Sequence, residues 1–242
     1  MTRVLAVIPA RYGATRFPGK PLARLWGKPM LQHVWERARE TRGLDRLVIA
    51  TDDDRIERAA RAFGAEVERT SPECASGTDR VAEVARRAAA AGIVLNLQGD
   101  EPELDAVGVT RLVAGMRADD ALRMATLAHP EPDALALATP EVVKVGVDAA
   151  GFALYFSRRD PAAERRAGTV LRHVGVYGFQ RDFLLEFASW PPGGLEQEER
   201  LEQLRALERG VRIRVFASDR AFSGVDTPEQ LAALERRGPR GN

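Results

Sequence analysis

The chain is poor in the residues that build disulfides and zinc sites. It has one cysteine, Cys74, and three histidines among 242 residues. A single thiol excludes an internal disulfide and any zinc site made from several thiolates, and no Ser-His-Asp arrangement is identifiable. The N-terminal apolar run, residues 4–9, is too short to cross a membrane and lacks a signal-peptide cleavage pattern. These absences predict a cytoplasmic protein with no membrane partner.

An excess of charge of one sign is absent as well. Lys and Arg total 36 while Asp and Glu total 35, which gives a net charge of +1. No global field therefore points to nucleic acid or to a membrane surface, and any anion site must be local. The apolar fraction of 45% is ordinary for a globular protein. Because we find no internal repeat, low-complexity tract or linker, we predict a single domain over residues 1–242.

Short apolar runs alternate with longer amphipathic stretches, a pattern typical of a mainly parallel sheet flanked by helices. Strands are predicted at 4–9, 46–50, 65–69 and 93–97, and helices at 30–41, 56–63, 79–91 and 105–116. In the middle third, antiparallel strands are predicted at 124–129, 142–147, 153–157 and 169–178. A helix at 196–209, a strand at 211–217 and a helix at 227–237 complete the expected α/β fold.

A loop rich in glycine and proline follows the first predicted strand. It reads ARYGATRFPGKP over residues 10–21, and its long cations are Arg11, Arg16 and Lys20. Glycine lets the backbone approach a ligand closely, and the cations can neutralise phosphate charge. The loop has neither the Ser or Thr that follows Lys in a Walker loop nor the GxGxxG spacing of a dinucleotide fold. It predicts a phosphate site, with a surface loop of solvated arginines as the alternative.

Two acidic motifs lie at predicted element boundaries: QGDEP at 98–102 and GVDTPE at 224–229. Asp100 follows a buried strand and can coordinate Mg²⁺, which prefers oxygen ligands, although an ordinary turn explains the same residues. Taken alone, the second motif predicts that Asp226 caps the last helix. A triphosphate near both carboxylates would favour a shared Mg²⁺ site, because two carboxylates plus phosphate oxygens and water make a normal shell.

The segment LRHVGVYGF at 171–179 is the third candidate site. Period-two alternation places His173 and Tyr177 on one face of a strand, and core packing explains such a face poorly. We therefore predict that this face binds a ligand. Glu202 and Gln203 lie in a predicted amphipathic helix, where simple solvation is the default interpretation.

Motifs along essentially the whole chain resemble the 3-deoxy-D-manno-octulosonate (KDO) cytidylyltransferase family. They include IPARYGATRFPGKPL, VIATDD, SGTDRVAEV, LNLQGDEP, FALYFSR, LRHVGVYGF, LEQLRALERG and GVDTPEQL. The resemblance implies a Rossmann-like nucleotide-diphospho-sugar transferase fold and a homodimer formed through a smaller antiparallel β region, at about 120–180. It also implies Mg²⁺ as cofactor, CTP and KDO as substrates, and the reaction CTP + KDO → CMP-KDO + diphosphate on the route to lipopolysaccharide.

The resemblance also implies roles for individual residues of this chain. The catalytic set is Arg16, Lys20, Asp100 and Asp226, with Asp100 and Asp226 as the metal ligands. The nucleotide-binding set is Ala10, Arg11, Gly13, Thr15, Arg16, Lys20, Ser76, Gly77 and Arg80. The acid-sugar set is Gln98, Arg158, His173, Tyr177, Glu202 and Gln203.

Two departures from the family pattern affect the expected substrates. Ala14 stands where the family usually has Ser, and the loop after Arg158 is short and lacks an aromatic segment. We expect retained but weaker CTP binding from the first departure. The second leaves open a cytidylyltransferase for a related acid sugar, such as amino-KDO or a nonulosonate. A non-catalytic nucleotide-binding homologue is the other alternative, and the presence of both Asp100 and Asp226 argues against it.

Overall fold

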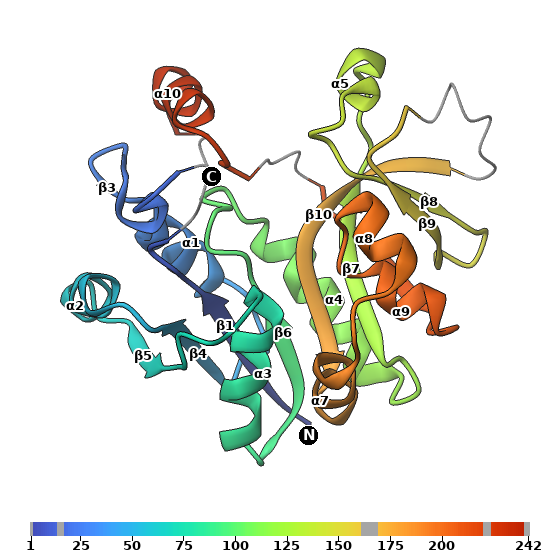
Figure 1. Cartoon of the computed structure of the whole chain (residues 1–242), viewed down its shortest axis with the longest axis horizontal. Helices are drawn as coiled ribbons and strands as arrows, with labels where there is room; N and C mark the ends of the chain where they lie inside the picture. Colours follow the sequence, from blue (N-terminus) through green and yellow to red (C-terminus); the bar gives the residue numbers. More distant parts are fainter. Residues whose placement is uncertain (1, 14–16, 161–168, 220–223, 240–242) are drawn as a thin grey trace.

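The computed structural model describes residues 2–13, 17–160, 169–219 and 224–239 (Figure 1). Its strands are β1 (Arg3–Pro9), β2 (Arg24–Leu25), β3 (Lys28–Pro29), β4 (Arg46–Thr51), β5 (Glu66–Arg69), β6 (Ala91–Asn96), β7 (Met124–His129), β8 (Lys144–Val147), β9 (Ala153–Ser157), β10 (Thr169–Gln180) and β11 (Ile213–Ala217). Its helices are η1 (Lys20–Leu22), α1 (Met30–Ala38), α2 (Asp54–Ala62), α3 (Gly77–Arg87), α4 (Ala106–Ala118), α5 (Ala134–Ala138), α7 (Arg181–Ser189), α8 (Gly194–Glu199), α9 (Leu204–Glu208) and α10 (Pro228–Arg237).

One nine-stranded sheet organises the molecule, with the main order β11-β7-β10-β6-β1-β4-β5. Every strand on this path runs in the same direction except β10. Strands β8 and β9 extend the sheet antiparallel from β10, on the side away from β5 (Figure 1). The short β2–β3 pair is separate. The predicted mainly parallel sheet with a smaller antiparallel region is therefore confirmed.

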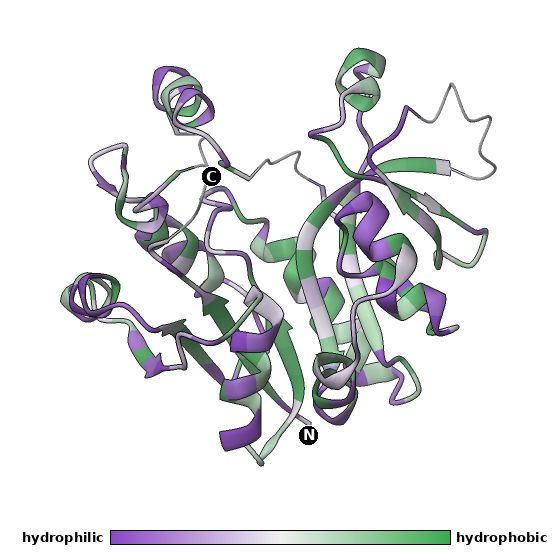
Figure 2. Cartoon of the chain, viewed as in Figure 1, coloured by the Kyte–Doolittle hydropathy of each residue, from purple (hydrophilic) through white to green (hydrophobic). Residues whose placement is uncertain are grey.

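The central strand β1 is buried on both faces, which explains its continuous apolar sequence. On one face, Val4 and Ile8 belong to a core with residues of α1, α2 and α4. On the other face, Leu5 and Val7 belong to a core with residues of α3, α7 and α9. Hydrophobic strands thus lie between two helical layers, and most of these helices combine hydrophilic with hydrophobic residues (Figure 2). Among the described residues, no helix has the length and apolar character needed to span a membrane.

Strand β10 changes partners along its length. Its C-terminal part pairs with β6, its N-terminal part pairs with β8, and β7 lies beside most of it. The pairing with β7 is interrupted, because Val174 pairs with Leu127 and the next paired residue, Tyr177, is opposite Thr126. The two residues between them form a bulge, a feature that bends a strand and redirects its side chains.

In the C-terminal third, one sequence prediction is wrong and one helix was missed. The single helix expected over 196–209 is two short helices, α8 and α9, because Arg200 adopts a left-handed conformation with φ 55° and ends the first. Helix α7 was not predicted, although it contributes Phe183, Leu184 and Phe187 to the core.

Candidate active site

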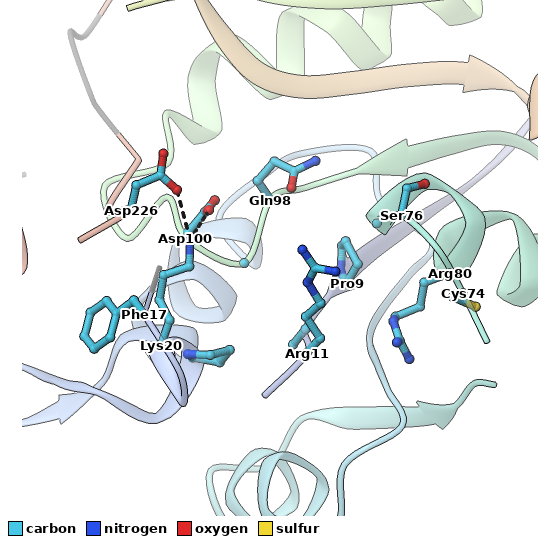
Figure 3. Close-up of a pocket in the computed structure, with 14 residues that line it drawn as sticks. Pro9, Arg11, Phe17, Lys20, Cys74, Ser76, Arg80, Gln98, Asp100 and Asp226 are labelled. Atoms are coloured by element: carbon cyan, nitrogen blue, oxygen red, sulfur yellow. Dashed lines mark hydrogen bonds and ion pairs between the residues drawn. The ribbon is translucent and has the colours of Figure 1, made fainter. Parts of the chain in front are cut away.

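A cavity of about 290 Å³ opens at the carboxyl ends of β1 and β6 (Figure 3). Parallel strands end at the same edge of a sheet, which is where open α/β folds bind ligands. The loop after β1, helix η1, the start of α3, the loop after β6 and the segment before α10 all contribute to it. The lining residues are Pro9, Ala10, Arg11, Phe17, Lys20, Pro21, Cys74, Ser76, Gly77, Arg80, Gln98, Gly99, Asp100 and Asp226.

Lys20 joins two carboxylates at the edge of this cavity. Its Nζ lies 2.6 Å from Asp100 Oδ2 and 3.3 Å from Asp226 Oδ1 (Figure 3). Gly19 sets up this position: at φ 72° it precedes η1, and its N–H donates to the Tyr12 carbonyl at 2.9 Å. Glycine suits this left-handed conformation because it has no Cβ. Three segments that are distant in the sequence therefore meet at one ammonium group.

Asp226 is not the cap that its motif predicts. Thr227 caps α10 instead, and its hydroxyl accepts from the Gln230 N–H while the Gln230 side chain accepts from the backbone. Because Thr227 does the capping, the Asp226 carboxylate is directed to Lys20. The Val225 N–H donates to the Asp100 carbonyl at 2.8 Å, which holds the two acidic segments side by side.

Asp100 and Asp226 form a donor set that fits a hard divalent cation. Each carboxylate has an oxygen within 3.3 Å of the same point, the Lys20 Nζ. Within the described part of the chain, no group of three or more acidic, His or Cys side chains could hold a metal ion. An ion between these two carboxylates would thus need further oxygen ligands from a substrate and from water.

The N-terminus of α3 forms the other end of the cavity. Ser76 caps this helix in a reciprocal capping box with Asp79. In the first turn, Arg80 is 3% exposed, and its Nη2 lies 3.0 Å from Asp52 Oδ1. Its Nη1 also donates to the Thr70 hydroxyl. The cavity therefore has a buried, fixed cation at the positive end of a helix, which favours a negatively charged ligand.

Cys74, to which the sequence assigned no role, lines the same cavity. Its thiol lies 3.3 Å from Glu83 Oε2. Burial, together with the neighbouring Glu83 carboxylate, raises the pKa of Cys74 to about 11. The group is therefore a neutral thiol at physiological pH and is unsuited to act as a nucleophile.

A second group of predicted residues surrounds the bulged part of β10. The rings of His173 and Tyr177 are 5.5 Å apart, and Phe156 packs edge-on against His173 at 5.1 Å. Burial and the nearby Arg158 guanidinium lower the pKa of His173 to about 3, so its ring is neutral. Burial and the carboxylate of Glu202 raise the pKa of Tyr177. The prediction that the two rings share one face is confirmed.

A chain of polar side chains connects this group to the cavity. Gln98 donates to Asn96 Oδ1 at 3.3 Å, and Asn96 donates to the Thr78 hydroxyl at 3.2 Å. Thr78 then donates to Glu202. Sequence reasoning missed Asn96 and Thr78. The only feature that marks them as candidate site residues is that each is a polar residue at a buried position.

The remaining residues predicted to bind nucleotide or sugar lie in different surroundings, and some are outside the described part of the chain. The Arg158 guanidinium donates to the carbonyls of Glu199 at 3.2 Å and Pro140 at 3.1 Å. Gln203 is buried, and its Nε2 has no hydrogen-bond partner among the described residues. Gly13 does not line the cavity. Ala14, Thr15 and Arg16, and most of the shortened loop after Arg158, lie outside the described residues.

Glu101 is a further residue that the sequence analysis did not assign. It is 6% exposed, and its Oε1 accepts from the Gly175 N–H of β10 at 3.1 Å. Burial and the adjacent Asp100 carboxylate raise the pKa of Glu101 to about 8. Glu101 thus links the loop that bears Asp100 to the strand that bears His173 and Tyr177.

Comparison with known proteins agrees with this geometry. A family model described as "Cytidylyltransferase" matches residues 5–213. The 3-deoxy-manno-octulosonate cytidylyltransferase of an Anaeromyxobacter species is 52% identical, with 99% of this chain and 100% of the relative aligned. The enzyme of the same name from Geobacter sulfurreducens is 47% identical, over 94% of this chain and 96% of the relative.

Solved structures give the same result. A CMP:2-keto-3-deoxy-manno-octonic acid synthetase complexed with CTP has a TM-score of 0.90 and 44% identity, and 98% of each chain is covered. A cytidylyltransferase from Leptospira borgpetersenii has a TM-score of 0.65 at 18% identity, over 97% of this chain and 86% of the other, and shares the fold. Sequence and structure together show that this chain belongs to the cytidylyltransferase family, among the 3-deoxy-manno-octulosonate cytidylyltransferases.

Proposed function

We propose that this protein transfers CMP from CTP to KDO and releases diphosphate, a step that supplies activated sugar for lipopolysaccharide. The observation that carries the proposal is the meeting of Lys20, Asp100 and Asp226 at the edge of a cavity that also presents Arg11 and Arg80. A relative that is 44% identical over nearly its whole length is a synthetase complexed with CTP, which supports CTP as the ligand of this cavity.

The reaction requires alignment and neutralisation of charge more than covalent help from the protein. The anomeric hydroxyl of the sugar forms a bond to the α-phosphorus of CTP and gives up its proton to water. The bond from the α-phosphorus to the bridging oxygen breaks, and diphosphate leaves with the electron pair. Arg11 and Lys20 line the cavity and would neutralise the phosphates. Arg16 is assigned the same role by its place in the motif.

Asp100 and Asp226 would hold Mg²⁺. Bound there, the ion would offset phosphate charge and lower the pKa of the attacking hydroxyl. In the protein alone, Lys20 balances these two carboxylates. When a nucleotide binds, the same ammonium can donate to a phosphate oxygen, because Lys is a flexible point charge with three donors.

The acid sugar would bind beside His173 and Tyr177, with Gln98 facing both substrates. Arg158 is the partner proposed for the sugar carboxylate, since a guanidinium keeps further N–H donors after its bonds to Glu199 and Pro140. Glu202 and Gln203 would bind sugar hydroxyls. Because His173 is neutral, its ring can accept a hydrogen bond from a sugar hydroxyl, while Arg158 supplies the positive charge for the carboxylate.

We further propose a cytoplasmic homodimer formed through the antiparallel region around β8 and β9. Two large apolar side chains of this region are exposed: Leu135 at 79% and Leu154 at 51%. Apolar side chains left in solvent on a β-rich extension favour coverage by a second subunit. Light scattering of the purified protein tests the dimer, and a monomer at working concentration would contradict it.

The activity is tested by incubating the purified protein with CTP, Mg²⁺ and KDO and measuring diphosphate release. ATP, GTP, UTP and other acid sugars are the substrate controls. Asp100→Asn should abolish most of the release, whereas Asp182→Asn, at an exposed position on α7, should leave it intact. Release that needs both CTP and KDO supports the proposal. Release with another acid sugar alone would assign a related enzyme, and none with any sugar, despite CTP binding, would refute catalysis.

A further inference from the structure

We propose that Thr126 is a positioning residue for the acid-sugar pocket: its hydroxyl holds the bulge in β10 that brings His173 and Tyr177 together. The inference rests on the proposed function, because the pocket it describes is the one assigned to the acid sugar. Thr126 belongs to β7, is fully buried and does not line the nucleotide cavity.

The bulge shortens the distance between the two rings. His173 pairs with Ala128 and Tyr177 pairs with Thr126, so their partners are two positions apart on β7 while they are four apart on β10. Four residues of a regular strand span about 13 Å, and two span about 6.6 Å. The observed separation of the ring centroids is 5.5 Å. A regular β10 would keep both rings on one face but too far apart to contact one sugar group together.

Two side chains take the place of the backbone partners that the bulge loses. Thr126 Oγ1 lies 2.7 Å from the Val176 carbonyl and 3.3 Å from the Val174 carbonyl. On the opposite side, Glu101 Oε1 accepts from the Gly175 N–H at 3.1 Å. Buried backbone groups need such partners, and removing one leaves a carbonyl unsatisfied. Thr126 is therefore the residue of β7 on which the shape of the bulge depends.

The same hydroxyl also fixes the protonation of His173. Thr126 has one proton, which it gives to the nearer carbonyl, that of Val176, so its oxygen accepts from His173 Nε2, 3.0 Å away. The neutral ring then carries its proton on Nε2 and keeps Nδ1 as an acceptor. A nitrogen that accepts hydrogen bonds can bind a sugar hydroxyl, which donates one.

The test compares Thr126→Val, which keeps the volume and removes the hydroxyl, with Thr126→Ser, which keeps the hydroxyl. Thr41→Val is the matched control, because the buried Thr41 hydroxyl has no hydrogen-bond partner among the described residues. We expect Thr126→Val to raise the KM for KDO about tenfold, the effect of losing one buried hydrogen bond, and to leave the KM for CTP within about twofold. Thr126→Ser should restore most of the affinity, and Thr41→Val should behave as wild type.

A second readout needs no substrate. In ¹⁵N NMR spectra, wild type and Thr126→Ser should show His173 protonated on Nε2, whereas Thr126→Val should show a mixture of tautomers. An unchanged tautomer in Thr126→Val would overturn the proposal, as would equal increases of both KM values or a Ser variant no better than Val. If the wild-type protein releases no diphosphate, that result refutes the proposed function only. The NMR spectrum still tests the role of Thr126, because it needs no substrate.

If Thr126→Val does not fold, Gly175→Ala disturbs the bulge from its other side. A Cβ at this position would lie 3.1 Å from Glu101 Oε1 and 3.1 Å from Gln98 Cγ, so both neighbours must shift. We expect this variant to raise the KM for KDO by about fivefold or more. A KM for KDO equal to that of wild type would show that the bulge does not position the pocket.

Discussion

Lys20 Nζ and Asp100 Oδ2 lie 2.6 Å apart, although 80 positions separate the two residues in the chain. The pair connects the loop after β1, predicted to bind phosphate, with the loop after β6, predicted to bind metal. Asp226 completes the group at 3.3 Å from the same ammonium. One cation thus balances two carboxylates that would otherwise repel each other.

This relationship predicts that Lys20 competes with Mg²⁺ in the absence of nucleotide. Lys20→Met should strengthen binding of Mg²⁺ alone by about fivefold, because the two carboxylates lose their internal counter-charge, and should weaken CTP binding. Isothermal titration calorimetry measures both affinities. Lys28→Met, which removes an exposed partner of Glu36, is the control. Equal Mg²⁺ affinity in Lys20→Met and wild type would contradict the prediction.

Lys144 is a buried cation with a structural role. It is 0% exposed, and its Nζ donates to the carbonyls of Thr139 at 3.0 Å, Val142 at 2.9 Å and Arg158 at 2.5 Å. Lys144→Met should lower the free energy of unfolding by about 3 kcal/mol, since three carbonyls lose a donor. Urea denaturation measures the change. The variant should also raise the KM for KDO through Arg158, and a stability within error of wild type would refute the assignment.

The buried neutral His173 predicts a dependence of stability on pH. Its pKa is about 3 in the folded protein, below the ordinary 6.5, so the unfolded chain binds the proton first as the pH falls. The folded state therefore loses stability below about pH 6.5, by about 2 kcal/mol at pH 5 from this group. Unfolding free energies of wild type and His173→Gln, measured from pH 7 to pH 5, should diverge. Parallel curves would show that His173 is not held neutral.

Arg200 predicts a stabilising substitution. At φ 55° it is a non-glycine residue in the left-handed region, where its Cβ is unfavourable. Arg200→Gly should raise the free energy of unfolding by about 0.5–1 kcal/mol. Arg58→Gly, in the middle of α2, should lower it by about 1 kcal/mol and serves as the control. Thermal or urea unfolding distinguishes the two signs, and a destabilised Arg200→Gly variant would contradict the argument.

The sequence predicted the fold best for strands that are buried on both faces. Strands β1, β4 and β6 appear as continuous apolar runs, and the sequence correctly placed Asp100 after the buried strand β6 and placed the cationic loop after β1. The choice of Asp226 as the cap of α10 was wrong although a local signal exists, because Thr227 and Gln230 have the spacing of a capping box. The contact between Asp226 and Lys20 is tertiary and has no such signal.

Other features have no local signal at all. The left-handed residue that separates α8 from α9 is an arginine and not a glycine, so the apolar periodicity runs through the break. Period-two alternation gave the correct face for His173 and Tyr177 but not their separation, which the bulge in β10 determines. A β-bulge is defined by the pairing between two strands. The hydrophobic pattern of one strand therefore does not reveal it.

Helix α10 buries none of its residues, yet the segment before it supplies Asp226. It is attached by polar contacts: the Trp26 N–H donates to Glu235 at 2.6 Å, and Arg237 pairs with Glu103 at 2.5 Å. The second carboxylate of the candidate site is therefore carried by a segment whose helix can detach without opening either apolar core. Local unfolding of this helix would release Asp226 and leave the rest of the sheet intact.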